Sequence, residues 1–101
     1  MLDKKKRAAT KTRQRSQIQF VYSAPEAKQV YVAGEFNNWD LRSLPLKRDK
    51  DGTWKKKIGL SPGRYEYKLI ADDVWVEELP GVEITPNPFG TQNFVLRVPR
   101  S

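Results

Sequence analysis

The chain has 101 residues, 38% of them hydrophobic and 11% aromatic, which suits one small domain with a modest core. It contains no cysteine and no histidine. This composition excludes a disulfide framework, a thiolate metal site and any catalytic pair built on histidine, so we expect no cofactor and no metal. The formal net charge is +7, a balance that favours anionic partners such as nucleic acid unless the charge is confined to one segment.

The positive charge is concentrated at the N-terminal end of the sequence. Residues 1–17 hold seven Lys or Arg against one acid, Asp3, which gives +6, while the other 12 basic and 11 acidic residues give +1. Because it has almost no apolar residues, segment 1–16 is predicted to be a disordered basic tail. It is either a solubilising leader or linker, or an arm for RNA or another anionic surface. No signal-peptide core and no apolar run of membrane-spanning length occurs, so we expect a cytoplasmic protein without a membrane partner.

Residues 17–99 form the predicted domain, in which apolar and polar residues alternate between frequent turn signals. This pattern predicts an all-β antiparallel sandwich of about seven short strands and no helix. Pro45 should keep its strand at a sheet edge, because proline cannot donate to a ladder. The Pro-rich segment 79–92 is predicted to be a loop. The predicted strands are residues 18–22, 29–34, 44–46, 53–60, 64–71, 74–78 and 93–98.

The tryptophans fall into two classes by their place in this pattern. Trp54 lies inside a strand of strict alternation, which predicts a core residue. Trp39 and Trp75 instead follow the turn pairs 37–38 and 72–73, and neither lies in a clean alternating strand. They either cap the ends of the sandwich or form an exposed aromatic platform.

An exposed indole suits few ligands. One is a nucleobase, and another is a pyranose ring, which has an apolar face for stacking and a rim of hydroxyls that need hydrogen-bond partners. Lys68 should be exposed on the outer face of its strand, and Asn93 opens the last strand. An ammonium group and a side-chain amide supply the donors and acceptors that hydroxyls require.

Three stretches of the sequence, "VYVAGEFNNWD", "PGRYEYKLIADDVW" and "PNPFGTQNFVLRV", occur in this order. Together they resemble the glycogen-binding domain of family 48 carbohydrate-binding modules, which is found in the β-subunit of AMP-activated kinase and at the N-terminus of isoamylase and branching enzymes. The resemblance covers about residues 17–99. It is strongest to small stand-alone bacterial proteins with an isoamylase-type early-set domain, which often carry the same "PNPFG" run.

The resemblance implies an immunoglobulin-like sandwich that binds α-1,4-linked glucans such as glycogen, starch, maltooligosaccharides or cyclodextrin. Two features depart from the family pattern. The second turn is Asp72-Asp73 where Asp-Gly is usual, so Asp73 needs a positive φ in a type I′ turn. Residues 76–79 replace a Thr-His-Asp-Pro run. The positions that match the family's sugar-binding residues are Trp39, Lys68, Trp75, Phe89, Thr91 and Asn93.

Three functions follow from these observations. The first is a non-catalytic α-glucan-binding module, with a glycogen-metabolising enzyme as a further partner. The second is a protein-interaction or scaffold domain that does not bind sugar, and the third is nucleic-acid binding through the basic tail. We do not expect an enzyme, because the adjacent acids Glu77 and Glu78 would point to opposite sides of a strand. A glycosidase needs two carboxylates flanking one bond, and Glu35 and Asp40 are ordinary acids beside a turn.

Overall fold

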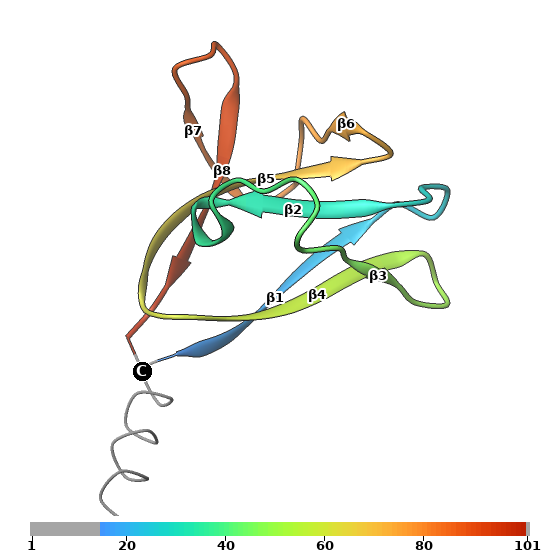
Figure 1. Cartoon of the computed structure of the whole chain (residues 1–101), viewed down its shortest axis with the longest axis horizontal. Coiled ribbons are helices and arrows are strands. Elements are labelled where there is room, and N and C mark those ends of the chain that lie inside the picture. Colours follow the sequence, from blue (N-terminus) through green and yellow to red (C-terminus); the bar gives the residue numbers. More distant parts are fainter. Residues whose placement is uncertain (1–14, 101) are drawn as a thin grey trace, which may run out of the picture.

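The computed structural model describes residues 15–100, which form two antiparallel β-sheets stacked as a sandwich (Figure 1). The predicted all-β sandwich is therefore confirmed. The predicted tail lies outside the described residues, apart from its last two positions. Within the described part of the chain, no helix is long and apolar enough to cross a membrane.

The first sheet has the strand order β1-β4-β3. Its strands are β1 (Ser16–Ser23), β3 (Lys47–Arg48) and β4 (Thr53–Leu60). Side chains alternate along β1 as the sequence predicts, with Phe20 buried, Ile18 and Tyr22 half-buried, and the residues between them exposed. Apolar positions of period two therefore set the register of this sheet, because a slip by one residue would expose the buried face.

The second sheet has the order β2-β5-β8-β7, and β6 also pairs with β5. Its strands are β2 (Val30–Gly34), β5 (Gly63–Ala71), β6 (Val74–Trp75), β7 (Glu83–Pro86) and β8 (Gln92–Val98). Tyr67 pairs with both β2 and β8, and Ile70 pairs with both β2 and β6, so β6 and β8 follow one another along the same edge of β5. Between those two strands, Lys68 lies opposite an interruption in the ladder.

The core lies between the two sheets. Trp54 is only 7% exposed, which confirms its predicted core position, and its indole Nε1 donates to the carbonyl of Ala24 at 2.9 Å. Tyr67 packs edge-on against Phe20, and burial raises the pKa of its hydroxyl to about 12. The buried core residues are Phe20, Val30, Val32, Leu46, Trp54, Tyr67, Leu69 and Phe94.

The predicted edge strand at residues 44–46 is wrong in detail. Pro45 forms only an isolated bridge with Tyr31, and the regular strand of this region is β3, which begins directly after the predicted one. Leu46 nevertheless donates its N–H to the Val30 carbonyl at 2.8 Å. Because Pro45 has no N–H, the ladder does not extend there, and the chain reaches its pairing with β4 two residues later.

The segment predicted as one long loop, 79–92, contains the edge strand β7. This strand pairs with β8 and has Ile84 half-exposed at its centre. Its prolines obscured it in the sequence, since proline is rare inside sheets but tolerated at their edges. The predicted strand 74–78 is also shorter than expected, because regular pairing of β6 ends at Trp75.

Candidate functional site

Trp39 is positioned by a turn of unusual backbone conformation. The 3₁₀ helix η1 (Glu35–Asn37) follows β2, and then both Asn38 and Trp39 take left-handed conformations, with φ of 57° and 58°. Left-handed backbone is common for asparagine but rare for a bulky side chain. Trp39 donates its N–H to the Gly34 carbonyl at 2.9 Å. The turn leaves its indole 37% exposed.

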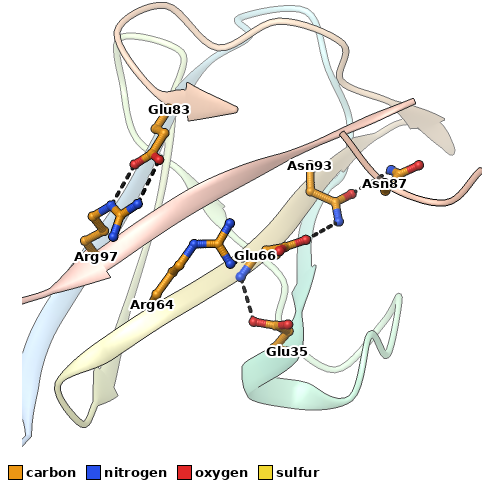
Figure 2. Close-up of polar contacts among 7 residues, drawn as sticks. All are labelled: Glu35, Arg64, Glu66, Glu83, Asn87, Asn93 and Arg97. Atoms are coloured by element: carbon orange, nitrogen blue, oxygen red, sulfur yellow. Dashed lines mark hydrogen bonds and ion pairs between the residues drawn. The ribbon is translucent and has the colours of Figure 1, made fainter. Parts of the chain in front are cut away.

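This turn is fastened to β5. The carboxylate of Glu35 accepts the backbone N–H of Glu66 at 2.9 Å (Figure 2). Gly34 is needed for the close approach, because a Cβ at this position would lie 2.7 Å from both the Glu66 carbonyl oxygen and the Tyr67 Cβ. The contacts at the end of β2 therefore fix the position of Trp39 beside β5.

Trp75 is positioned by the hairpin between β5 and β6. Asp72 and Asp73 both have positive φ, 50° and 67°, which is the type I′ geometry expected for this turn. The Asp72 carboxylate accepts the backbone N–H groups of Lys28 and Gln29 at 2.8 and 2.9 Å, so the hairpin is held against the β1–β2 connection. The indole of Trp75 is 43% exposed.

Lys68 fills the interruption between β6 and β8. Its ammonium lies 5.2 Å from the ring centroid of Trp75, within range of a cation–π interaction. It also donates to the Gln92 carbonyl at 3.0 Å and contacts the Thr91 hydroxyl at 3.4 Å. Since an ammonium has three donors, one of them is left for a ligand. Lys68 is half-buried rather than fully exposed as expected.

Asn87, which the sequence reasoning missed, organises the loop between β7 and β8. Its Oδ1 accepts the backbone N–H groups of Phe89 and Thr91 at 3.0 and 3.2 Å. Its Nδ2 donates to the Thr91 hydroxyl at 2.8 Å and to Asn93 Oδ1 at 3.0 Å. The Asn-Pro pair in the sequence was the available signal, because asparagine commonly bonds the backbone two residues on.

Asn93 connects this loop to β5. It is 6% exposed, and its Nδ2 donates to Glu66 Oε1 at 2.9 Å, while Arg64 donates to the other carboxylate oxygen at 2.9 Å. These hydrogen bonds, the one from Asn93 above all, hold the pKa of Glu66 below its usual value. Figure 2 shows the resulting chain of contacts from Glu35 through Glu66 and Asn93 to Asn87. The Asn93 amide thus supports the site from within and retains one free N–H.

All six sequence-predicted residues line a single cleft of ≈ 680 Å³. Phe89 stands at its rim with 88% of its surface exposed. The acids at the cleft are Glu35, Glu66 and Glu77, and Lys68 is its one cation among the described residues. No group of three or more acidic side chains within residues 15–100 could hold a metal ion. The cleft therefore offers flat aromatic surface, amide and ammonium donors, and carboxylate acceptors.

Two kinds of known protein are similar to this chain in sequence. The β-1 subunit of 5'-AMP-activated protein kinase from Rattus norvegicus is 32% identical over 74 residues, which cover 73% of this chain and 26% of the rat protein. The 1,4-alpha-glucan branching enzyme GlgB of Paraburkholderia xenovorans is 34% identical over 87 residues, which cover 80% of this chain and 12% of the enzyme. The chain thus spans about a quarter of the length of the rat and mouse kinase subunits that it matches.

The family model described as the glycogen recognition site of AMP-activated protein kinase matches residues 16–101. This match confirms the resemblance drawn from the three sequence motifs, and its first residue coincides with the start of β1. Every element that shapes the cleft lies within the matched residues. The chain therefore belongs to the family of glycogen recognition sites of AMP-activated protein kinase.

Proposed function

We propose that the domain is a non-catalytic module that binds α-1,4-linked glucans by stacking glucose on Trp39 and Trp75. The observation that carries the proposal is the single cleft in which these two half-exposed indoles lie with Lys68. The apolar faces of successive glucose units would cover the indoles, and the ammonium and the Thr91 hydroxyl would bond the sugar hydroxyls. Phe89 would close one wall.

The charge of the cleft supports a neutral sugar over a nucleic acid. Three carboxylates and one ammonium line it, so a phosphate backbone would meet net repulsion there, whereas nucleic-acid sites are rich in Lys and Arg. A hydroxylated, uncharged ligand uses carboxylates as acceptors without this penalty. The stacking surface is therefore better suited to a pyranose than to the base of a nucleotide.

The carboxylates themselves support binding without catalysis. A glycosidase needs one carboxylic acid with a raised pKa and a second carboxylate across the scissile bond. The pKa of Glu66 is lowered instead, and both of its oxygens are engaged by Asn93 and Arg64. Glu66 is thus held ionised as a structural acceptor, which is the wrong state for a general acid.

The physical scale of the interaction is modest. Covering one indole face removes on the order of 100 Å² of apolar surface, worth roughly 2 kcal/mol. Two faces and a few hydrogen bonds of about 1 kcal/mol each must exceed the several kcal/mol cost of association. We expect a dissociation constant between millimolar and about 10 μM for an oligosaccharide. A branched polymer would bind more tightly through avidity.

The test is a titration of the protein with maltoheptaose and β-cyclodextrin, followed by NMR and by tryptophan fluorescence. We expect saturable shifts at the indole signals of Trp39 and Trp75, with the Trp54 indole signal unchanged. A β-1,4-linked glucan of equal length serves as the matched control ligand. If neither α-glucan shifts the cleft residues at millimolar concentration, the domain is instead a scaffold that docks against other proteins.

An enzyme of glucan metabolism is the partner that we infer for this module. In the branching enzyme named above, the matched segment is only 12% of the protein, so there the related sequence is joined to a much larger chain. A module beside such an enzyme would raise the local concentration of its polymeric substrate.

A further inference from the structure

A second hollow borders the cleft and shares Trp75 with it. Its volume is ≈ 150 Å³, and its lining residues are Tyr31, Leu41, Arg42, Ile70, Asp73 and Trp75. None of these except Trp75 belongs to the cleft, and none except Trp75 matches a sugar-binding position of the family. The hollow therefore adds surface that the proposed function has not used.

The floor of the hollow is a row of side chains across three strands. Tyr31 on β2 pairs with Ile70 on β5, and Ile70 pairs with Trp75 on β6, so the three lie side by side on one face of the sheet. Lys68 and Ile70 are successive residues on that face of β5, about 7 Å apart along the strand. The floors of the cleft and the hollow are thus neighbouring rows of one surface.

The wall of the hollow comes from the loop after η1. The Asn37 amide holds this loop by donating to the Asp40 carbonyl at 3.1 Å and to the Ser43 hydroxyl at 2.9 Å. The Arg42 N–H donates to the Asp40 carboxylate at 2.9 Å. Leu41, which is 46% exposed, is therefore held over the apolar floor by a braced loop.

Two charged side chains border this apolar floor. Arg42 and Asp73 both line the hollow, and within residues 15–100 neither side chain makes a hydrogen bond or ion pair. A guanidinium offers a planar fork of donors and a carboxylate offers acceptors. An aromatic and aliphatic floor with such a pair at its edge matches the apolar face and vicinal hydroxyls of one hexose. A cavity of about 150 Å³ in another protein takes up benzene, so the hollow has room for a six-membered ring, and the hydroxyls of a hexose would extend from it to the charged edge.

We propose that this hollow is an additional subsite for one glucose unit of the α-glucan held in the cleft. A glucan that leaves the cleft across Trp75 passes directly onto the Tyr31–Ile70 row, where Arg42 and Asp73 bond its hydroxyls. The inference rests on the proposed function, and it makes the site selective for chains longer than the cleft alone can hold.

The experiment compares maltotriose with maltoheptaose by calorimetric titration. The variants are Arg42→Ala and Asp73→Asn, because asparagine tolerates the positive φ of residue 73. Val74→Ser is the matched control, since Val74 is 65% exposed beside Trp75 but lies outside the hollow. Arg42→Ala and Asp73→Asn should each lower the affinity for maltoheptaose about fivefold, the effect of one net hydrogen bond, and leave the affinity for maltotriose unchanged. Val74→Ser should leave the affinity for both sugars unchanged. In NMR spectra of the wild-type protein, maltoheptaose, but not maltotriose, should shift the Leu41 methyl signals.

The outcomes separate the subsite from the proposed function. If the wild type binds neither sugar, the proposed function fails and the subsite with it. If the wild type binds maltoheptaose, and Arg42→Ala and Asp73→Asn bind it as tightly as the wild type does, only the subsite fails. Equal weakening of both sugars would also overturn the subsite, because it would mean that Arg42 and Asp73 merely support the cleft.

Discussion

Trp54 and the pair Trp39 and Trp75 place the same side chain in opposite environments within one small domain. Trp54 is 7% exposed, with its indole N–H bonded to the Ala24 carbonyl and the Arg48 guanidinium 5.8 Å from its ring. Trp39 and Trp75 are 37% and 43% exposed. Trp54 lies in a regular strand, whereas each of the other two lies at or just after a turn of positive φ.

The difference lies in the backbone, because regular alternation along β4 sends Trp54 inward and packs it against the opposite sheet. At Trp39 the left-handed turn interrupts the alternation, and at Trp75 the type I′ hairpin reverses the chain two residues before the indole. In both cases the turn is fixed by carboxylate or amide contacts to neighbouring backbone. A side chain on a rigid turn loses little further freedom when a ligand covers it, so both exposed tryptophans suit the stacking role proposed above.

The largest effect should come from removing the buried member of this comparison. Trp54→Ala would leave a cavity in the core, so we expect a loss of about 3–5 kcal/mol in the free energy of unfolding. Denaturant and thermal unfolding measure it. A loss below about 1 kcal/mol would show that the core does not depend on this residue.

Removing either exposed tryptophan should act on binding instead. Trp39→Ala and Trp75→Ala should each weaken maltoheptaose about thirtyfold, since one stacking face is worth roughly 2 kcal/mol. Their melting temperatures should stay within a few degrees of the wild type. If both variants unfold as readily as Trp54→Ala, the distinction between buried and ligand-facing tryptophans is wrong.

A glycine variant sharpens the result at residue 39. Trp39→Gly should lose the same affinity as Trp39→Ala but be more stable than it by about 1 kcal/mol, because glycine adopts φ of 58° without strain. Thermal melting of the two variants side by side measures this difference. Equal stability would mean that the turn changes shape when the indole is removed.

Removing the Asn87 side chain should lower the affinity for maltoheptaose by less than removing Trp39 or Trp75, because Asn87 holds the loop in place and need not contact the sugar. Asn87→Ala removes the bonds to Phe89, Thr91 and Asn93. We expect affinity for maltoheptaose to fall about tenfold, the effect of roughly 1.4 kcal/mol, with faster backbone amide exchange in the loop. Asn87→Asp keeps the acceptor and should fall less. Unchanged exchange in Asn87→Ala would contradict the positioning role.

The effect of pH should be smaller still. Because the folded pKa of Glu66 lies below its usual value of 4.5, its contribution is complete above about pH 4.5 and is lost as the pH falls through the lowered value. Maltoheptaose affinity should therefore fall a few-fold below that range, because protonation removes the negative charge that strengthens the hydrogen bonds from Asn93 and Arg64 to Glu66. Glu66→Gln should bind more weakly at pH 6 but show a flatter pH profile. The control is Glu83→Gln, because the carboxylate of Glu83 pairs with Arg97 outside the cleft.

The smallest effect is expected from the basic segment. A neutral sugar gains little from positive charge on the protein. A chain that begins at Ser16 should therefore bind maltoheptaose with an affinity within about twofold of that of the full chain. Its affinity for RNA, measured in parallel at low salt, reports on the alternative use of the charge. Tenfold weaker sugar binding would show that residues 1–15 complete the cleft.

The sandwich could be predicted because its core residues repeat with a period of two, as Phe20 and Val32 show. The strand β7 could not, since Ile84 is 50% exposed at a sheet edge and prolines surround it. For such a strand, tertiary pairing with β8 decides the conformation, and local sequence does not.

The six proposed sugar-contacting residues could be placed together because they follow turns and strand ends that three sequence motifs mark. Their supports were harder to find. The contact between Asn93 and Glu66 joins residues 27 positions apart. Outside the cleft, Arg42 and Asp73 border the same hollow only because β2, β5 and β6 align in register. Pairing of this kind becomes visible only when the strand order is known.

The edge of β5 is unpaired between β6 and β8, and this gap leaves room for the sequence of the domain to change. Between Trp75 and Gln92 the chain passes through one regular strand, β7, and the segments on either side of it belong to no strand. Within residues 76–79, Glu77 lines the cleft, whereas Val76 and Leu79 pack against the core. A change at residue 77 can therefore alter one side of the cleft while the pairing of β5 with β2 stays intact.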